Sequence, residues 1–363
     1  MIRLEPRPQP SALWTYASPA LALAITIVIA VCIFIAFGKD PIRGLAIFFW
    51  EPIKSQYALT ELVLKATPLI VIALGLILSF RANVWNIGAE GQFLIGAIFA
   101  GGLAVWVTEN QFATNRWAFA PIIMLAGAVG GALWASIAAI CKDKFNASEI
   151  LVTLMLVYVA NLLLSYLVFG PWKDPKGFNF PQSIRFADDT LLPRLFATGR
   201  AHIGFLLSLL LSAAMWIFMF RMLRGYQLQV GGIAPLAARY AGFSSRSALW
   251  TALLVSGAFA GMAGAMEVAG PMGQLTPHVS NGYGFTAIIV AFVGRLHPVG
   301  VIFAAFLLSM FLIGGELSQS RLGLPSALSG VFQGLLLFAL LTCDTLVNNR
   351  IRWVGTRRNE VRA

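Results

Sequence analysis

The sequence predicts an all-α membrane protein, a polytopic bundle of about ten transmembrane helices. Of its 363 residues, 58% are hydrophobic, and the mean hydropathy is +0.79. Only 11% are charged, whereas about 25% of the residues of a soluble domain are charged. So few charges cannot form a water-soluble surface, which excludes the soluble globular and disordered classes. The apolar runs are unbroken, which favours helices over a β-barrel, whose strands alternate apolar and polar residues.

Ten apolar segments approach the length of about 20 residues that a helix needs to cross a bilayer. We expect spans at 18–38, 62–80, 91–107, 117–141, 149–170, 202–220, 248–266, 284–296, 298–315 and 326–343. The eighth is short and is followed by His297-Pro298, which predicts a tilted, broken or re-entrant helix packed inside protein or beside a cavity. Residues 42–52 are apolar but too short to cross, so we expect an interfacial helix there.

The arginines predict the topology. The segment 221–247 holds four arginines and no acid, and the end of the chain adds five more arginines. The positive-inside rule places both on the cytoplasmic side, which requires an even number of spans between them, as four spans provide. The chain then divides into a cytoplasmic N-terminal tail, a membrane domain with its longest outer loop on the opposite side, and a basic cytoplasmic tail, at 1–17, 18–343 (outer loop 171–201) and 344–363.

Two features of the spans concern their packing. Five spans precede the outer loop and five follow it, which suggests an internal structural repeat of the kind common in transporters. Three Gly-x-x-x-Gly spacings, beginning at Gly127, Gly257 and Gly330, allow helices to approach closely. These spacings predict close packing without saying which helices meet.

Motifs for catalysis or for a bound metal are absent from the sequence. It has no GxxxxGK[ST] phosphate loop, no HExxH and no GxSxG, so it cannot hydrolyse ATP by that route. The three cysteines have no CxxC spacing, and the three histidines fall at span ends or in loops. We therefore predict no enzyme activity, metal or cofactor on this chain. The net charge of +11 is explained by membrane orientation better than by nucleic-acid binding.

Polar residues within the spans form two clusters, and such residues mark either helix contacts or a pathway. In the first, 79–92, they are Arg81, Asn83, Asn86, Glu90 and Gln92. This segment is either a capped cytoplasmic turn or a broken segment whose amides and carboxylate face a polar cavity. In the second, 146–161, Asn146 and Ser148 can cap a helix with Glu149 in its first turn. Helical spacing places Glu149 and Thr153 on one face and Tyr158 and Asn161 on another. Thr286, in the short eighth span, is a weaker candidate, as is Glu267.

The inner segment 225–243 is different in kind. Pro235 can begin a helix at its first position, a run of small residues follows, and Gly242 can end it. A short helix outside the membrane, bearing Arg239 and Tyr240, has the form of a docking surface. Composition alone favours a plain interfacial connector.

Five motifs resemble those of one transporter family. They are VWNIGAEGQ (84–92), SEILVTLML (148–156), FGPWKDPKGFNFPQS (169–183), AARYAGF (237–243) and GYGFTAIIVAFVGRLHPVGV (282–301). Together they resemble the permease subunit of ATP-binding-cassette (ABC) importers of the ribose/galactose permease superfamily, within it the nucleoside or simple-sugar type. The resemblance implies a multi-pass protein of the bacterial inner membrane with both termini cytoplasmic.

The resemblance also implies partners and site residues. A second, homologous permease would form a heterodimer with this chain, a separate double-cassette ATPase would bind ATP and Mg²⁺, and a periplasmic or lipid-anchored binding protein would deliver the nucleoside. The loop after the sixth span would hold the helix that couples to the ATPase, through Gly232, Pro235, Ala238, Arg239, Tyr240 and Gly242. The substrate path would be lined by Asn83, Asn86, Glu90, Gln92, Thr153, Tyr158, Asn161 and Thr286.

The sequence departs from the family pattern at three places. The family reads Asn before the proline at Pro235, Asn before the tyrosine at Tyr158, and Asn before Glu149, whereas this chain has Ala234, Val157 and Ser148. These departures leave the architecture intact and leave the particular nucleoside or sugar open. The rival interpretation is a channel or a secondary transporter driven by an ion gradient. It would need a carboxylate or histidine relay within a span, but the acids near spans lie close to span ends.

Overall fold

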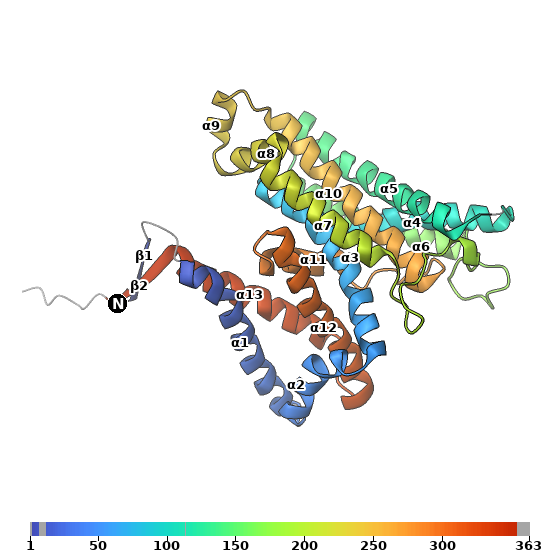
Figure 1. The fold of residues 1–363 in the computed structure, drawn as a ribbon, viewed down its shortest axis with the longest axis horizontal. Coiled ribbons are helices and arrows are strands. Elements are labelled where there is room, and N and C mark those ends of the chain that lie inside the picture. Colours follow the sequence, from blue (N-terminus) through green and yellow to red (C-terminus); the bar gives the residue numbers. More distant parts are fainter. Residues whose placement is uncertain (1, 7–11, 113, 354–363) are drawn as a thin grey trace, which may run out of the picture. The chain divides into compact units, whose positions relative to one another are not determined.

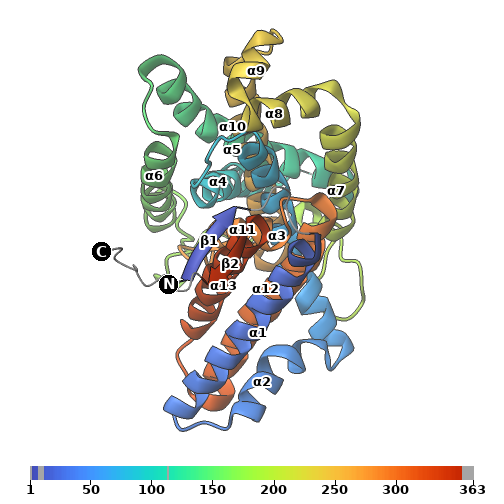
Figure 2. The same cartoon turned by 90° about the vertical axis from the view of Figure 1, so that its left-hand side faces the viewer.

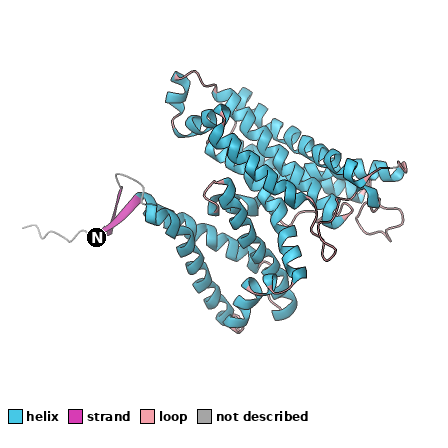
Figure 3. Ribbon diagram, viewed as in Figure 1, coloured by secondary structure: helices cyan, strands magenta, loops and turns pink. Residues whose placement is uncertain are grey.

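The computed structural model describes residues 2–6, 12–112 and 114–353 (Figure 1). This part of the chain is mostly helical, with loops and one pair of short strands, as the colouring of Figure 3 shows. It separates into two compact units, one formed by described residues within 1–50 and 313–363 and the other by residues 51–312. The prediction of an all-α polytopic bundle is confirmed.

Among the described residues, helices occupy all ten predicted spans, and nine of these helices are long and apolar enough to cross a membrane. They are α1 (Ala12–Ala36), α3 (Gln56–Arg81), α4 (Ala89–Glu109), α5 (Arg116–Phe145), α6 (Glu149–Phe169), α7 (Gly204–Arg221), α10 (Ser245–Glu267), α12 (Pro298–Leu322) and α13 (Leu328–Asn348). The predicted short eighth span is α11 (Tyr283–Val293), which has 11 residues.

The first unit is built around α1 and α13, which pack along each other (Figure 2). The predicted short helix is α2 (Pro41–Phe49), which begins because Asp40 accepts a hydrogen bond from the backbone N–H of Ile42 and Pro41 occupies the first turn. Phe34, Phe48 and Phe332 form an aromatic cluster with ring centroids 5.1–6.1 Å apart. This cluster joins α1, α2 and α13.

The ends of the described chain pair in the same unit. Strand β1 (Ile2–Pro6) runs antiparallel to β2 (Asn349–Trp353), and Glu5 lies 3.6 Å from Arg350. The helix α1 begins at residue 12, within the segment 1–17 that we predicted as a tail. Of the arginines expected on the cytoplasmic side, Arg7, Arg357, Arg358 and Arg362 lie outside the described residues.

The core of the second unit is α10, which packs against α3, α4 and α5. Glycines make this close packing possible. A Cβ atom built on Gly261 would lie 2.1 Å from the carbonyl oxygen of Gly127, and one built on Gly131 would lie 2.1 Å from that of Gly257. Two of the Gly-x-x-x-Gly spacings therefore face each other, one from α5 and one from α10.

The predicted outer loop 171–201 lies along the end of α10. Its backbone donates hydrogen bonds from Ser183 to Leu275, from Phe186 to Gly273 and from Leu192 to Ala269, at 2.8–2.9 Å. It includes the 3-10 turn η2 (Asp188–Thr190), and the residues it meets include the π-helical turn η3 (Val268–Met272), which extends α10.

His202 follows this loop and is buried. Its ring packs against Gly204 and Gly270, and its Nδ1 accepts a hydrogen bond from the N–H of Gly204. Burial lowers the pKa of His202 to about 4. The imidazole is therefore neutral at pH 7 and serves packing.

Three shorter helices complete this unit. The 3-10 turn η1 (Glu51–Ile53) precedes α3. After α7 the chain forms α8 (Leu223–Ile233), which packs against α3 and α7, and α9 (Pro235–Tyr240), which lies beyond the ends of α7 and α10 in Figure 1. Helix α10 then begins at Ser245, where the hydroxyl of Ser244 accepts a hydrogen bond from the N–H of Ser247. Within the segment 221–247, α8 and α9 thus form a helical hairpin that connects α7 to α10.

Candidate functional site

The helix α9 has the bounds that the sequence predicts. Pro235 stands at its first position, and Gly242 follows its end with a φ of +78°, a left-handed conformation that suits glycine. The N–H of Phe243 donates to the carbonyl of Ala238, closing the helix end. Ala238 is buried and anchors the helix, whereas Arg239 is exposed and Tyr240 is 100% exposed. The six-residue helix therefore presents an arginine and a tyrosine outward.

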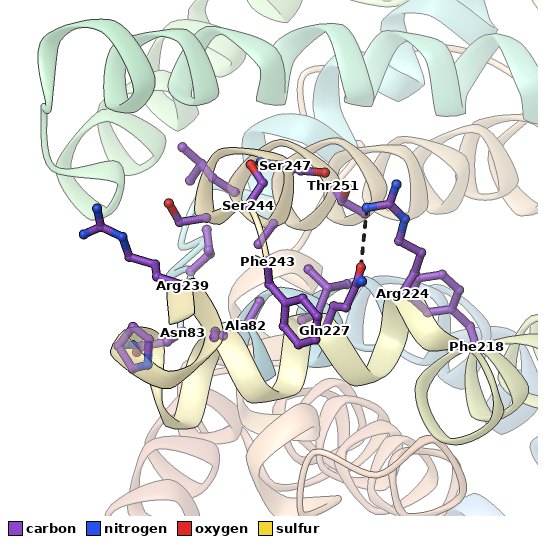
Figure 4. A pocket seen from close by; sticks show the side chains of 18 residues that line it. Ala82, Asn83, Phe218, Arg224, Gln227, Arg239, Phe243, Ser244, Ser247 and Thr251 are labelled. Atoms are coloured by element: carbon purple, nitrogen blue, oxygen red, sulfur yellow. Dashed lines mark hydrogen bonds between the residues drawn. The ribbon is translucent and has the colours of Figure 1, made fainter. Parts of the chain in front are cut away.

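A cavity of about 520 Å³ lies beside α9 (Figure 4). It is bounded by α8, α9, the first turns of α10, the end of α7 and residues 82–84, which follow α3. Phe218, Leu228 and Phe243 contribute apolar surface. Arg239 and Arg224 lie toward opposite ends of the cavity in Figure 4. No acidic side chain occurs among the described residues that line it, so its charge is positive.

Gly232, another predicted coupling residue, has a packing role on α8. A Cβ atom at this position would lie 2.1 Å from the carbonyl oxygen of Arg81. Only glycine allows α8 to approach the end of α3 so closely. The predicted coupling residues therefore divide into those exposed on α9 and those that hold α8 and α9 in place.

The turn between α3 and α4 forms a buried polar corner, defined by Asn86, Gln92 and Ser256. The Asn86 Nδ2 donates to Gln92 Oε1 at 2.8 Å and to Ser256 Oγ at 2.9 Å, and Gln92 Nε2 donates back to Asn86 Oδ1 at 3.1 Å. All three side chains are at most 1% exposed. Their hydrogen bonds satisfy one another and tie the start of α4 to α10, which supports a role in holding the core together.

Three other predicted path residues lie close to this corner in the fold. Glu90 accepts a hydrogen bond from the N–H of Gly284, at the start of α11, at 2.6 Å. The hydroxyl of Thr153 accepts from the N–H of Ile87 at 3.3 Å and donates to a carbonyl of its own helix, and Thr286 is buried in α11. The structure thus brings Asn86, Glu90, Gln92, Thr153 and Thr286 into the packed interior of the second unit.

The remaining path candidates lie elsewhere. Asn83 is exposed, accepts a hydrogen bond from the indole N–H of Trp85, and lines the cavity beside α9. Tyr158 is 63% exposed and Asn161 is exposed, both on α6, while Thr153 on the same helix is buried. The separation of Thr153 from Tyr158 and Asn161 onto different faces is confirmed, and a role of any of these residues in the path stays a prediction.

Two residues that sequence reasoning missed take part in these contacts. Ser256 completes the polar corner, and Gln229 on α8 accepts a hydrogen bond from Arg81. Ser256 is separated from its partner Asn86 by 170 residues, and Gln229 from Arg81 by 148. No local pattern in the sequence could have identified either pairing.

The described residues form a multi-pass helical bundle with a hydrogen-bonded interior and an exposed helical hairpin, which places the chain in the class of polytopic membrane proteins. The family model described as "Branched-chain amino acid transport system / permease component" matches residues 58–341. The chain therefore belongs to this family and is a permease subunit of an ABC transporter. This result favours the ABC interpretation over a transporter driven by an ion gradient.

Individual relatives of this chain are also permease proteins of ABC transporters. The chain is 34% identical to the glucose ABC transporter permease protein TsgB13 of Haloferax volcanii, over 98% of this chain and 95% of the relative. It is 31% identical to the guanosine ABC transporter permease protein NupP of Bacillus subtilis, over 85% and 88%. It is 25% identical to the nucleoside ABC transporter permease protein NupB of Lactococcus lactis, over 88% and 89%.

Proposed function

We propose that this chain forms part of the membrane path of an ABC importer for a nucleoside or a related simple sugar. It works with a second, homologous permease, with a separate ATPase that carries two nucleotide-binding cassettes and binds ATP and Mg²⁺, and with an extracytoplasmic binding protein that delivers the solute. The complex lies in the bacterial inner membrane, with both termini of this chain on the cytoplasmic side. The observation that carries the proposal is the exposed helix α9 beside a basic cavity.

The surface of α9 suits a protein partner. Tyr240 and Leu236 are 100% and 79% exposed, and Tyr and Arg dominate the binding energy of many interfaces. The two arginines of the cavity, Arg224 and Arg239, add positive charge that would complement an acidic surface on a partner. The surrounding segment, 221–247, has four arginines and no acid, which supports its cytoplasmic position. An ATPase docked here drives the permease by moving α9.

The exposed polar residues of α6 support a shared path. Asn161 lies within a membrane-spanning helix but is exposed, and an amide facing lipid costs free energy that a partner or water removes. Tyr158 is exposed on the same helix. We place this face of α6 toward the second permease or the solute, so that the path opens and closes between the two subunits.

The coupling role is tested with the double variant Arg239→Ala, Tyr240→Ala. We expect co-purification of the co-expressed ATPase and ATP-dependent uptake both to fall by at least about tenfold, because truncating central Tyr and Arg anchors has effects of this size. The matched control is Phe178→Ala, Arg185→Ala, which removes an exposed aromatic and an exposed arginine from the loop 171–201. This control is expected to retain the ATPase. Normal assembly and wild-type uptake with both α9 side chains removed contradicts the coupling role.

The substrate class is tested by competition. Uptake of a labelled nucleoside by vesicles containing the complete transporter is measured in the presence of adenosine, guanosine, free bases, ribose or glucose. We expect nucleosides to compete and free ribose not to, since a site that pairs with base and sugar together discriminates strongly against ligands that leave its polar groups unpaired. Uptake of labelled ribose or glucose by the same vesicles, with no uptake of the labelled nucleoside, shows that the solute is a sugar.

A further inference from the structure

Arg81, the last residue of α3, joins two segments that are far apart in the sequence. Its Nε donates a hydrogen bond to the carbonyl of Leu296, just after α11, at 2.8 Å. Its Nη1 donates to the Oε1 of Gln229 on α8 at 2.7 Å. Both are short, charge-assisted hydrogen bonds made by one planar group. The guanidinium therefore links the hairpin that carries α9 to the turn that ends α11.

The connection to α8 is stiff. The side-chain Nε2 of Gln229 donates to the carbonyl of Met219 at 2.6 Å, which fixes the orientation of its acceptor oxygen. The guanidinium of Arg81 lies 5.3 Å from the ring centroid of Phe220, a cation–π contact. The backbone of Gly232 lies directly against the carbonyl of Arg81. These contacts hold α8 to the end of α3 in one arrangement.

The connection from α8 to α9 is continuous. The N–H of Ala234 donates to the carbonyl of Val230 on α8, and the N–H of Ala238 on α9 donates to the carbonyl of Ala234, at 2.8 and 2.9 Å. Through these bonds we expect a displacement of α9 to move α8, and with it the Gln229 oxygen that Arg81 binds.

The far side of the link is the end of α11. Arg295 and Leu296 have φ values of +60° and +50°, and the N–H of Leu296 donates to the carbonyl of Ala291 at 2.8 Å. This left-handed turn aims the Leu296 carbonyl at Arg81. The other end of α11 is held by Glu90. The two side chains that bind the ends of α11, Arg81 and Glu90, thus come from the end of α3 and the start of α4.

We propose that Arg81 is the joint that transmits the movement of α9 to α11, and that it acts as a positioning residue for coupled transport. The proposal rests on the proposed function, because it needs an ATPase that moves α9. Arginine suits this task because its rigid fork of five donors binds two acceptors in fixed directions. Lysine carries the same charge but lacks this geometry, so it cannot replace arginine here.

The test cuts one side of the joint with Gln229→Leu and, separately, alters the joint itself with Arg81→Lys. The complete transporter is purified and placed in vesicles, and ATP hydrolysis and solute uptake are measured on the same preparation. We expect assembly with the ATPase and ATP hydrolysis to be retained, while solute transported per ATP falls about tenfold, the factor that corresponds to one lost charge-assisted hydrogen bond. Gln229→Glu, which keeps an acceptor for Arg81 but loses the donor to the Met219 carbonyl, is expected to give a ratio between those of Gln229→Leu and the wild type.

The control on the same helix is Tyr226→Phe, which removes an exposed hydroxyl outside the cavity and is expected to leave the ratio unchanged. A wild-type ratio in Gln229→Leu and Arg81→Lys overturns the proposal. So does a parallel loss of yield, hydrolysis and uptake, which indicates a role in folding alone. If the wild-type chain assembles with no ATPase, the proposed function itself is wrong. If the wild type assembles and Gln229→Leu keeps the wild-type ratio of solute transported per ATP, only the role of Arg81 is wrong.

Discussion

Substitution of Gly261 by valine is expected to destabilise the second unit more than any other single change considered for this chain. A Cβ atom at Gly261 would lie 2.1 Å from the carbonyl oxygen of Gly127 and 2.8 Å from the Cα of Gly131. These are backbone atoms of α5, which cannot rotate away as a side chain can. Overpacking of a core costs about 1–3 kcal/mol and occasionally more, and we expect the upper end of this range. Thermal unfolding of the purified protein in detergent measures the loss.

The chain provides its own control for this substitution. Gly334 belongs to the third Gly-x-x-x-Gly spacing, on α13, and a Cβ atom there would meet no atom within 4 Å. Gly334→Val introduces the same β-branched side chain into a helix without a clash. Its unfolding temperature is expected to stay close to that of the wild type. Equal stability of the two variants would show that α5 and α10 do not pack through these glycines.

Substitution of Glu90 by alanine is expected to loosen α11. The Glu90 carboxylate accepts the hydrogen bond of the Gly284 N–H at 2.6 Å and also bonds with Ser280 and Gly282. An 11-residue helix is too short to be stable alone, and its first N–H groups need acceptors. Leaving them unpaired in a buried site costs about 1–3 kcal/mol. Hydrogen–deuterium exchange over residues 280–286 should become about 5- to 150-fold faster, with a loss of uptake.

The matched variant is Glu90→Gln, which keeps the length of the side chain and one acceptor oxygen but removes the negative charge that favours a helix N-terminus. We expect its hydrogen–deuterium exchange rate over residues 280–286 to lie between the rates of the wild type and of Glu90→Ala. Unchanged exchange in Glu90→Ala would mean that α11 is held by its packing, without need of this carboxylate.

The elements whose signals are local could be predicted from the sequence. Unbroken apolar runs gave the spans, and Pro235 and Gly242 marked the ends of α9, because a fixed φ and a left-handed φ are properties of single residues. The pairing of the glycines of α5 with those of α10 could not be predicted, since all Gly-x-x-x-Gly spacings look alike in a sequence. Only the three-dimensional arrangement distinguishes Gly261, which is packed, from Gly334, which is open.

The candidate site was predicted in part for the same reason. Asn86 and Gln92 were recognised as polar groups within apolar surroundings, but their mutual hydrogen bonds depend on the turn between α3 and α4 and on Ser256 from a distant helix. Helical spacing separated Thr153 from Tyr158 correctly. Helical spacing could not show that Thr153 faces the bundle interior, because the sequence does not say which helices pack against each face of α6.

The hydrogen bonds of the polar corner have a consequence for where a solute can travel. Asn86, Gln92 and Ser256 bond to one another at 2.8–3.1 Å, so a molecule passing between them would first have to pull them apart. The path that we propose past Tyr158 and Asn161 on α6 avoids these hydrogen bonds. On this proposal one copy of the chain supplies only part of the lining of the path, and a second permease subunit supplies the rest.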